Sequence, residues 1–318
     1  MATSGRTDPA SPEELERIWA LVRNWGRWGA DDERGALNFL SAERCARAAS
    51  LVRDGLHLSL AHDLPVRPSP ESPYPAHHHM LAGGDARDAS GIPGYEASSD
   101  YVGTPVHGLG ITHIDALCHM FVRGEMYNGV PASEVRSNGA RRNSILLLEA
   151  GIVGRGVLLD VPAALGVDFL GPAEAIGVED LEAAERAQGV RVEPGDLLIV
   201  STGRDARRRA AGGSLDPFRE GLAGLDPRCL PWLREREIAV LGGDGISDRM
   251  PARTTPGWPF PIHQIGITGI GLHLIDNLSL TALLAACAQR RRYAFLCAVA
   301  PLRIPGGTGC PVNPVAIL

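Results

Sequence analysis

The chain carries Thr112-His113-Ile114-Asp115-Ala116-Leu117-Cys118-His119 directly after an apolar, glycine-rich segment. Successive side chains of an extended strand point to opposite faces. His113 and Asp115 therefore share one face, while Ile114 points into apolar packing, and His119 returns to the same point only through a turn or a helix start. Imidazole and carboxylate ligands suit a borderline divalent ion such as zinc or manganese. The stretch predicts a metal or catalytic site; the alternative is a strand whose His and Asp satisfy buried backbone groups.

The composition is that of an ordinary globular protein. The chain has 318 residues, of which 44% are hydrophobic and 21% charged, and its formal net charge is -6. These values allow a large core and give no support for a nucleic-acid or anionic-membrane partner. The six cysteines are scattered without a C-x-x-C pair, which disfavours a thiolate zinc site. Because neither an apolar signal core nor a long apolar run is present, we expect a soluble, cytoplasmic protein.

Cap and turn signals organise the N-terminal third of the chain. Ser11-Pro12-Glu13-Glu14 combines a capping residue with proline at the first helical position, and this predicts a helix over 12–24. A disordered tail is expected over 1–10 and a second helix over 42–54. Residues 63–105 are rich in Pro, Gly, Ser and Asp and are expected to form a long irregular loop.

Strands and helices are expected to alternate beyond residue 106. Apolar runs of a few residues bounded by Gly or Pro are typical of buried strands. The expected strands are 145–148, 156–161, 196–201, 238–242 and 294–302, and the expected helices are 179–188, 229–236 and 279–289. The alternation predicts an α/β protein with a mixed core sheet flanked by helices.

A second group of polar residues lies in an unusually apolar run far downstream. His263 and Asp276 are both costly to bury without a partner, which makes them candidate ligands. Each could instead be a hydrogen-bonded core residue, and Asp276 could cap the helix expected at 279. His273, in the same run, is expected to belong to the core or the surface.

Other polar clusters are weaker signals. The adjacent residues His77-His78-His79 cannot all face one ion on a regular element, so a solvated or substrate-rim loop is favoured over metal contact. The stretch Gly242-Gly243-Asp244-Gly245 lacks a phosphate-loop pattern and indicates a tight turn. Asp244 and Asp248 are expected to be structural or to line a pocket.

These motifs resemble the putative cyclase family, which includes bacterial kynurenine formamidase and isatin hydrolase. The family motif is H-x-G-T-H-x-D-x-x-x-H, and residues 112–115 with His119 match its second half. His263 and Asp276-Asn277-Leu278 resemble the later His and acidic residue of the family. The similarity runs from about Trp25 to the C-terminus. It includes pieces similar to a longer, less characterised bacterial branch, namely 28–38, 126–129, 194–196, 201–203 and 300–302.

The resemblance implies a swivelling β/β/α fold in a single catalytic domain over 11–318, assembled as a homodimer or homotetramer. It also implies one or two divalent ions, held by His113, Asp115, His263 and Asp276. Asp115 and His119 would be catalytic, with His119 assisting proton transfer while a water attacks an amide or lactam carbonyl.

The chain departs from the family pattern at the first ligand. Leu109 stands where the first histidine is expected, four residues before His113. His107 lies two residues out of register and could substitute only if Gly108 and Gly110 allow a bulge. The downstream acid is an aspartate rather than the usual glutamate. We therefore expect one zinc or manganese ion per chain rather than two, and loss of the metal is the alternative.

Three functional hypotheses follow from these residues. The leading one is a metal-dependent hydrolase that uses a metal-activated water to open a cyclic amide, imide or lactone, or to cleave an aryl formamide. The second is a non-hydrolytic cyclase, dehydratase or isomerase of secondary metabolism, with the metal optional. The third is a small-molecule binding protein with a decayed site. Tyr127, Trp258 and Phe260 are candidate walls for an apolar or aromatic substrate, and ordinary core packing is the alternative for each.

Overall fold

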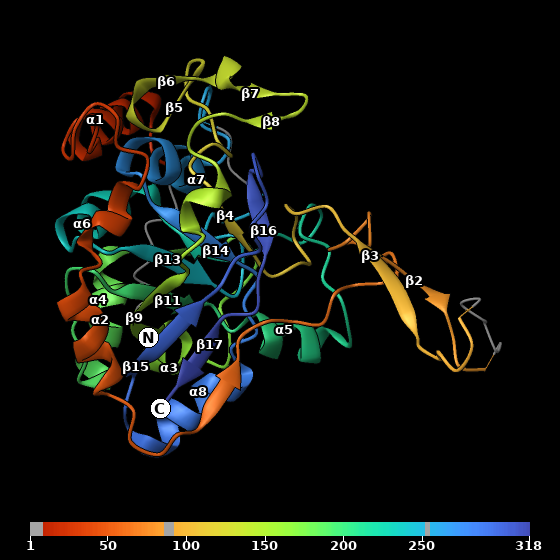
Figure 1. The fold of residues 1–318 in the computed structure, drawn as a ribbon. Helices are drawn as coiled ribbons and strands as arrows, with labels where there is room; N and C mark the ends of the chain where they lie inside the picture. Colours follow the sequence, from red (N-terminus) through yellow and green to blue (C-terminus); the bar gives the residue numbers. More distant parts are fainter. Residues whose placement is uncertain (1–8, 86–91, 252–254) are drawn as a thin grey trace.

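A nine-stranded sheet forms the centre of the molecule (Figure 1). The computed structural model describes residues 9–85, 92–251 and 255–318. In order across the sheet, the strands are β1 (His57–Ser59), β17 (Val315–Ile317), β15 (Ala294–Val299), β9 (Ile152–Asp160), β11 (Leu197–Ser201), β13 (Val240–Gly243), β14 (His273–Asp276), β4 (His113–Asp115) and β16 (Gly309–Pro311).

The sheet is parallel in its middle and antiparallel on both sides. Strands β9, β11, β13 and β14 run parallel to one another. On one side β15, β17 and β1 follow in antiparallel order. On the other side β4 is antiparallel to β14, and β16 is antiparallel to β4. The expected mixed sheet is confirmed, and the polar stretch begins on a strand that borders the parallel centre.

Helices flank this sheet, as the sequence predicted. They are α1 (Pro12–Val22), α2 (Ala42–Ala49), α3 (Val161–Leu165), α4 (Val178–Gln188), α5 (Arg204–Ala211), α6 (Leu230–Glu235), α7 (Pro261–Ile265) and α8 (Thr281–Arg290). Strands β11 and β13 are buried along their whole length, so each supplies side chains to both faces. Leu159 and Val200 join a cluster with residues of α1, α4, α6 and α7. Leu158 and Ile199 join a second cluster with residues of α8 and β15.

Short elements complete the mixed α/β domain. Four small ladders pair β2 (His77–Ala82) with β3 (Ser99–Gly103), β5 (Glu125–Met126) with β6 (Val130–Pro131), β7 (Val135–Arg136) with β8 (Gly139–Ala140), and β10 (Ala175–Ile176) with β12 (Gly224–Leu225). The 3-10 helices are η1 (Gly35–Phe39), η2 (Tyr127–Gly129), η3 (Ala132–Glu134), η4 (Ile145–Leu148) and η5 (Pro227–Cys229), and η6 (Gly266–Ile270) is a π-helical turn after α7.

The N-terminal helix begins where the cap signal predicted. The Ser11 hydroxyl accepts a hydrogen bond from the backbone N–H of Glu14, and Pro12 opens the helix. The second helix is shorter than expected, because it ends at Ala49 rather than near residue 54. The backbone N–H groups of Asp54 and Gly55 donate instead to the carbonyl of Leu318. The chain here is therefore bonded to the C-terminal residue rather than to a helical turn.

The strand predicted at 145–148 is wrong, since these residues form the 3-10 helix η4. Ile145 and Leu148, three residues apart, are buried, whereas Leu147 is 43% exposed. One helical turn buries residues at this spacing, so a continuous apolar run was an ambiguous signal. The other predicted strands and helices beyond residue 106 are present with shifted ends.

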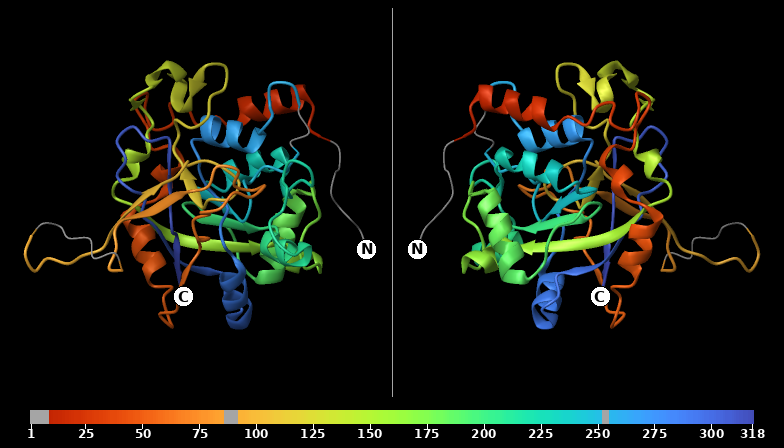
Figure 2. Two further views of the ribbon diagram at one scale, coloured as in Figure 1. Left: turned by 90° about the vertical axis from the view of Figure 1, so that its right-hand side faces the viewer. Right: turned by 90° about the vertical axis from the view of Figure 1, so that its left-hand side faces the viewer.

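The segment over 63–105 is only partly irregular. Strands β2 and β3 pair antiparallel within it and form an arm that projects from the body (Figures 1 and 2). Of the expected tail, residues 1–8 lie outside the described residues, whereas Ala10 is buried and its carbonyl accepts from the Thr255 hydroxyl. In the described parts of the chain, every helix is too short or too polar to cross a bilayer.

Candidate functional site

Strands β4 and β14 bring the two halves of the predicted site together. His113 lies directly opposite Asp276 in the antiparallel pairing of these strands, so both side chains leave the sheet on one face. Asp115 follows on the same face of β4, and all three residues are buried. The His113 Nε2 atom lies 3.4 Å from Asp115 Oδ1 and 4.0 Å from Asp276 Oδ2. The predicted convergence is therefore confirmed, and Asp276 is part of β14 rather than a helix cap.

His263 reaches the same carboxylates from helix α7. Its Nε2 atom lies 3.2 Å from Asp276 Oδ2 and 3.5 Å from Asp115 Oδ2. Its Nδ1 atom lies 2.7 Å from Asp248 Oδ2, and the same carboxylate accepts the backbone N–H groups of Ile262 and His263. Asp248 thus anchors the first turn of α7 and fixes which ring nitrogen faces the site.

His107 belongs to the site although its sequence position was out of register. Its Nδ1 atom lies 2.8 Å from Asp115 Oδ1, and its Nε2 atom lies 2.9 Å from the Thr308 hydroxyl. The ring stacks on His119, with centroids 3.6 Å apart and planes 7° apart. His119 Nε2 lies 4.0 Å from Asp115 Oδ1. The side chains of His107 and His119 are 27% and 24% exposed, so these two imidazoles form the open side of the site.

Two glycines allow His107 to approach. Gly108, next to His107, has φ of 154°, a conformation that residues with a Cβ rarely adopt. A Cβ at Gly309, on β16, would lie 2.8 Å from His107 Cε1, so glycine is needed where the ring lies against that strand. Gly108 was the sequence signal that His107 could approach the site.

The first ligand position of the family motif is not a ligand in this chain. The side chain of Leu109 packs with Phe260 against a small apolar cluster that includes Met250. The carbonyl of Leu109 accepts a 2.7 Å hydrogen bond from Arg204. Arg204, which the sequence analysis did not single out, also donates to Asn277 beside Asp276.

Strong electrostatic coupling surrounds Asp115. Burial opposes a charge on His113, but its hydrogen bond to Asp115 and the nearby carboxylates raise its pKa to about 9. Burial also opposes a charge on His263, yet Asp276 and the other carboxylates raise its pKa well above its usual value. Burial would raise the pKa of Asp115, but the surrounding imidazoles hold it well below its usual range. The buried carboxylates thus require positive charge, from protonated imidazoles or from a bound cation.

His119 behaves differently from the other imidazoles. Burial lowers its pKa to about 4; the neighbouring imidazoles add to this effect, and Asp115 opposes it. With its pKa lowered in this way, His119 is neutral near pH 7.

The donor set fits a divalent ion. Zinc binds His nitrogen and carboxylate oxygen at about 2.0–2.2 Å, so four tetrahedral ligand atoms lie about 3.4 Å from one another. The separations of His113 Nε2 and His263 Nε2 from the nearest oxygens of Asp115 and Asp276 are 3.2 to 4.0 Å, close to this value, with Asp115 facing His113 through Oδ1 and His263 through Oδ2. Asp115 Oδ2 and Asp276 Oδ1 are buried and have no hydrogen-bond partner among the described residues. Such unpaired oxygens are the exception in folded proteins and are ready to bind a cation.

Two overlapping groups of ligand atoms share Asp115. One consists of His113, Asp115 and Asp276, and the other of His107, Asp115 and His119; the atoms of each group lie within 4.8 Å of one another.

His273, expected in the core or at the surface, is buried and its Nδ1 atom lies 2.9 Å from the Asp115 carbonyl.

Two of the three expected substrate-contacting aromatics are core residues instead. Tyr127 is fully buried, and its hydroxyl donates to Asp32. Trp258 is 3% exposed and packs at 5.8 Å from the ring of Trp19. Their aromatic character gave no means of separating a pocket wall from core packing. Phe260 remains a candidate wall, because it lies three residues before His263 at the start of α7.

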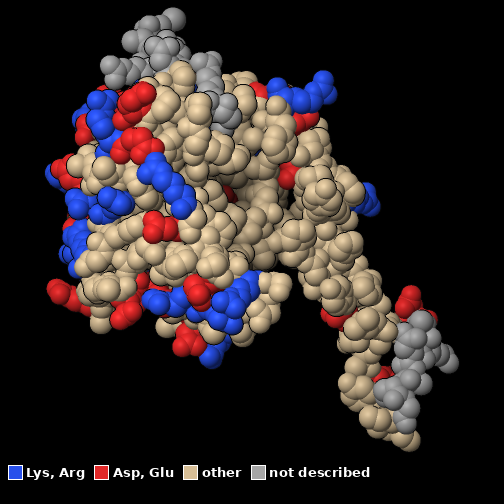
Figure 3. Space-filling model, turned by 90° about the horizontal axis from the view of Figure 1, so that it is seen from above, with Lys and Arg blue, Asp and Glu red and all other residues tan. Residues whose placement is uncertain are grey.

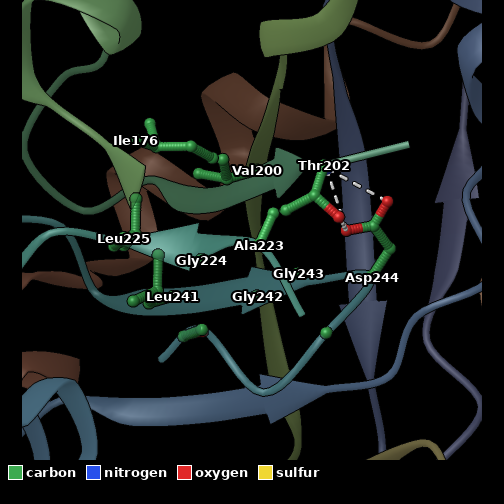
Figure 4. A pocket seen from close by; sticks show the side chains of 12 residues that line it. Ile176, Val200, Thr202, Ala223, Gly224, Leu225, Leu241, Gly242, Gly243 and Asp244 are labelled. Carbon is green, nitrogen blue, oxygen red and sulfur yellow. Dashed lines mark hydrogen bonds between the residues drawn. The ribbon is translucent and has the colours of Figure 1, made fainter. Parts of the chain in front are cut away.

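The glycine-rich turn after β13 is structural, as expected. The Asp244 carboxylate accepts from the hydroxyl and backbone N–H of Thr202 (Figure 4). It also accepts from the backbone N–H groups of Gly203 and Arg204. The apolar pocket beside this turn has a volume of about 10 Å³, which is about the space of one water molecule. It cannot hold a substrate.

The triplet His77-His78-His79 lies on the projecting arm, away from this site (Figure 1). All three residues are exposed. His78 Nε2 contacts the exposed Asp100 at 2.8 Å, and the His79 ring lies 5.1 Å from that of Tyr101. The structure therefore keeps the triplet out of the buried group.

Comparisons with known proteins match this fold. The family model described as Putative cyclase matches residues 56–248. A solved structure described as a novel cyclase is 32% identical, with a TM-score of 0.83, and the match covers 93% of this chain and 100% of that one. No match was found among curated proteins.

Two isatin hydrolases share the fold at lower identity. Isatin hydrolase A from Labrenzia aggregata, bound to benzyl benzoate, is 22% identical with a TM-score of 0.56, over 85% of this chain and 94% of that one. An isatin hydrolase bound to the product analogue thioisatinate is 18% identical with a TM-score of 0.58, over 88% and 99%.

Proposed function

Because this chain belongs to the Putative cyclase family, we propose that it is a metal-dependent hydrolase. Its substrate would be a cyclic amide, imide or lactone, or an aryl formamide. The observation that carries the proposal is the convergence of His113, Asp115, His263 and Asp276, with one buried oxygen of each carboxylate left without a partner. Burying such oxygens is costly unless a cation or a donor binds them.

These four residues would hold one zinc or manganese ion per chain. When bound, such an ion lowers the pKa of a coordinated water from ~15.7 to about 7 and polarises a carbonyl oxygen. The chain itself presets the ligands. The carbonyl of Ile111 binds His113 Nδ1 at 2.8 Å, and Asp248 binds His263 Nδ1 at 2.7 Å, so both imidazoles aim Nε2 at the shared carboxylates.

His119 would transfer the protons of the reaction. It stands at the open side of the site, with Nε2 4.0 Å from Asp115 Oδ1, where a substrate can approach it. His107, bonded to Asp115 and Thr308, holds one face of the His119 ring by stacking. Leu109 and Phe260 would offer an apolar wall, which suits an aromatic or otherwise apolar substrate.

Elemental analysis of the purified full chain tests the metal. The expected result is about one zinc or manganese ion per chain, lost in Asp276→Ala and retained in Asp31→Ala, which removes an exposed carboxylate outside the site. Hydrolysis of isatin, a cyclic imide, a lactone and formanilide would then be assayed with and without a chelator. A metal-free chain that still turns over one of these substrates contradicts the proposal.

A non-hydrolytic cyclase, dehydratase or isomerase is the second candidate. It is favoured by the direct 2.8 Å contact between His107 and Asp115 beside His119, an acid–base array that needs no ion. Product analysis in ¹⁸O-labelled water separates the two, because hydrolysis incorporates solvent oxygen into the product and isomerisation does not.

A further inference from the structure

Two buried side chains outside the proposed ligand set hold the segment that joins His107 to His113. This connecting segment, residues 108–112, leads directly into β4. Arg204, at the start of helix α5, and Asn277, directly after β14, both donate hydrogen bonds to it. Arg204 is 3% exposed and Asn277 is fully buried. Buried polar side chains are nearly always hydrogen-bonded, so the partners of these two residues show what they hold in place.

The guanidinium of Arg204 makes five hydrogen bonds, one for each of its N–H groups. Nε and Nη2 donate to the Glu71 carboxylate at 3.1 and 2.6 Å, and Nη2 also donates to the Leu109 carbonyl at 2.7 Å. Nη1 donates to Asn277 Oδ1 at 2.6 Å and to the Asp244 carbonyl at 3.1 Å. The five donors of a guanidinium lie in one plane with fixed directions. Arg204 therefore ties the residues that follow β13 and β14 to the connecting segment in one geometry.

Asn277 extends this network to a proposed metal ligand. Its Nδ2 atom donates to the carbonyls of Gly108 and Ile111 at 2.8 and 3.0 Å, and its own carbonyl accepts from the Thr112 hydroxyl at 2.6 Å. The Ile111 carbonyl also accepts from His113 Nδ1 at 2.8 Å. One carbonyl thus binds both the Asn277 amide and the imidazole, so the amide fixes the direction of the acceptor that orients the ring.

The ion pair of Arg204 and Glu71 is a costly way to hold a loop. The two side chains are only 2% and 7% exposed. The cost of removing two charges from water often cancels their attraction, so a buried pair is weak evidence for stability. An apolar pair could not supply the directed bonds to the Leu109 carbonyl and to Asn277 Oδ1. Positioning therefore explains this arrangement better than stability does.

The connecting segment also packs closely against the chain at the base of the arm. Glu71 and Ser72 precede β2 and the arm that extends from the body in Figure 3. A Cβ at Gly110 would lie 3.0 Å from Ser72 Cβ and 3.1 Å from the Glu71 carbonyl oxygen. The backbone of the segment is thus confined by close packing as well as by the hydrogen bonds of Arg204 and Asn277.

We propose that Arg204 and Asn277 are positioning residues for the metal site, acting on His113 through the Ile111 carbonyl. The inference rests on the proposed function, because His113 is one of the four proposed ligands. A ring fixed through Nδ1 presents Nε2 to the shared carboxylates in advance, which reduces the ordering cost of binding an ion. Arg204 also holds the carbonyl of Leu109, whose side chain packs with Phe260 as the apolar wall.

Titration of the metal-free full chain with zinc tests the proposal in two variants. Asn277→Gly removes the amide at a position where φ is 56°, a conformation that glycine adopts without strain. Arg204→Lys keeps a positive charge beside Glu71 but offers three donors in place of five. Each substitution should weaken zinc binding by about 10- to 100-fold, the range typical of residues that orient ligands.

Arg155→Lys is the matched control. Arg155 binds Asp196 through two hydrogen bonds of 2.8 Å, and Asp196 precedes β11 at the opposite end of the parallel strands from Asp276. The control should lower the melting temperature but leave zinc affinity unchanged. An equal loss of affinity in the control, or full affinity in both site variants, overturns the proposal. Unfolding of both site variants would assign the pair to stability and would overturn it as well.

The imidazole signals of the metal-free chain give a second readout that needs no ion. The Nδ1 proton of His113 should exchange slowly with solvent in ¹⁵N-edited NMR spectra of the unmodified chain and of Arg155→Lys. It should exchange faster in Asn277→Gly and in Arg204→Lys, and slow exchange in both folded site variants contradicts the positioning role. An unmodified chain that binds no zinc would contradict the proposed function instead, and the ring signal would still decide whether the pair orients His113.

Discussion

The adjacent histidines His77-His78-His79 spread over an exposed strand, whereas four non-adjacent histidines, one of them remote in the sequence, meet around one buried carboxylate. The second group is His107, His113, His119 and His263, around Asp115. Adjacent residues on a strand diverge, while sheet register can align residues more than a hundred positions apart, as it does for His113 and Asp276. The site therefore combines one local stretch, residues 107–119, with Asp276, which strand pairing brings in, and His263, which helix α7 brings in.

The two regions also differ in how each imidazole is held. His113 is bonded through Nδ1 to a backbone carbonyl, and His263 is bonded through Nδ1 to a carboxylate. The Nε2 atom of each ring is therefore held in one orientation, toward the shared carboxylates. His78 has a single contact, to Asp100, and both are about half exposed. An exposed ion pair of this kind contributes little to the free energy of unfolding. The 2.8 Å contact of His107 with Asp115 thus belongs to an organised site, whereas the 2.8 Å contact of His78 with Asp100 lies on a solvated surface.

The largest effect is expected from the shared carboxylate. Asp115→Asn should remove the ion and lower kcat/KM by about 10²-fold or more, above the range typical of residues that only orient ligands. Asp100→Asn is the matched control, since it breaks the equivalent contact on the arm and should leave both quantities unchanged. Metal content by elemental analysis and steady-state kinetics measure the difference. Equal effects of the two substitutions would remove the distinction between the regions.

His119→Gln should separate proton transfer from metal binding. The expected loss in kcat is about 10²- to 10⁴-fold, the range of general acid–base catalysis, with the metal retained because His119 is not one of the four proposed ligands. Metal content and the pH profile of kcat are the measurements. Loss of the ion in this variant would instead place His119 among the ligands, with His107 and Asp115.

Asp248→Asn tests the orientation of His263. The substitution keeps the shape of the side chain but weakens its hold on Nδ1, and metal affinity should fall by about 10- to 100-fold. Titration of the metal-free protein with zinc reports the affinity directly. If Asp248 were only a helix anchor, thermal stability would fall while zinc affinity stayed the same.

The smallest effect is expected from the arm triplet. Replacing His77, His78 and His79 together by Ala should leave metal content unchanged and shift the free energy of unfolding by less than about 0.5 kcal/mol for each exposed position. Thermal unfolding and elemental analysis check both statements. A loss of bound metal would show that the triplet is a second ligand group.

Local sequence patterns predicted much of the fold and half of the candidate site. The Ser11 cap, the apolar strands and the two-residue spacing of His113 and Asp115 were sufficient because each depends on neighbours in the chain. Asp276 was a candidate because it is an acid in an apolar run, but that pattern could not identify its partner, which is remote in the sequence. The roles of Asp248 and Arg204 depend on tertiary contacts and left no local pattern, and Tyr127 could not be assigned to core or pocket without its bond to Asp32.

Asp115 belongs to both groups of candidate ligands, one with His113 and Asp276 and one with His107 and His119. Sharing one carboxylate makes the two groups thermodynamically linked. Whatever binds through His107 and His119 changes affinity at His113 and Asp276 by some factor, and occupancy there changes affinity at the open side by the same factor. The buried group and the open group therefore respond to charge as one unit, and a measurement of binding at either group reports on both.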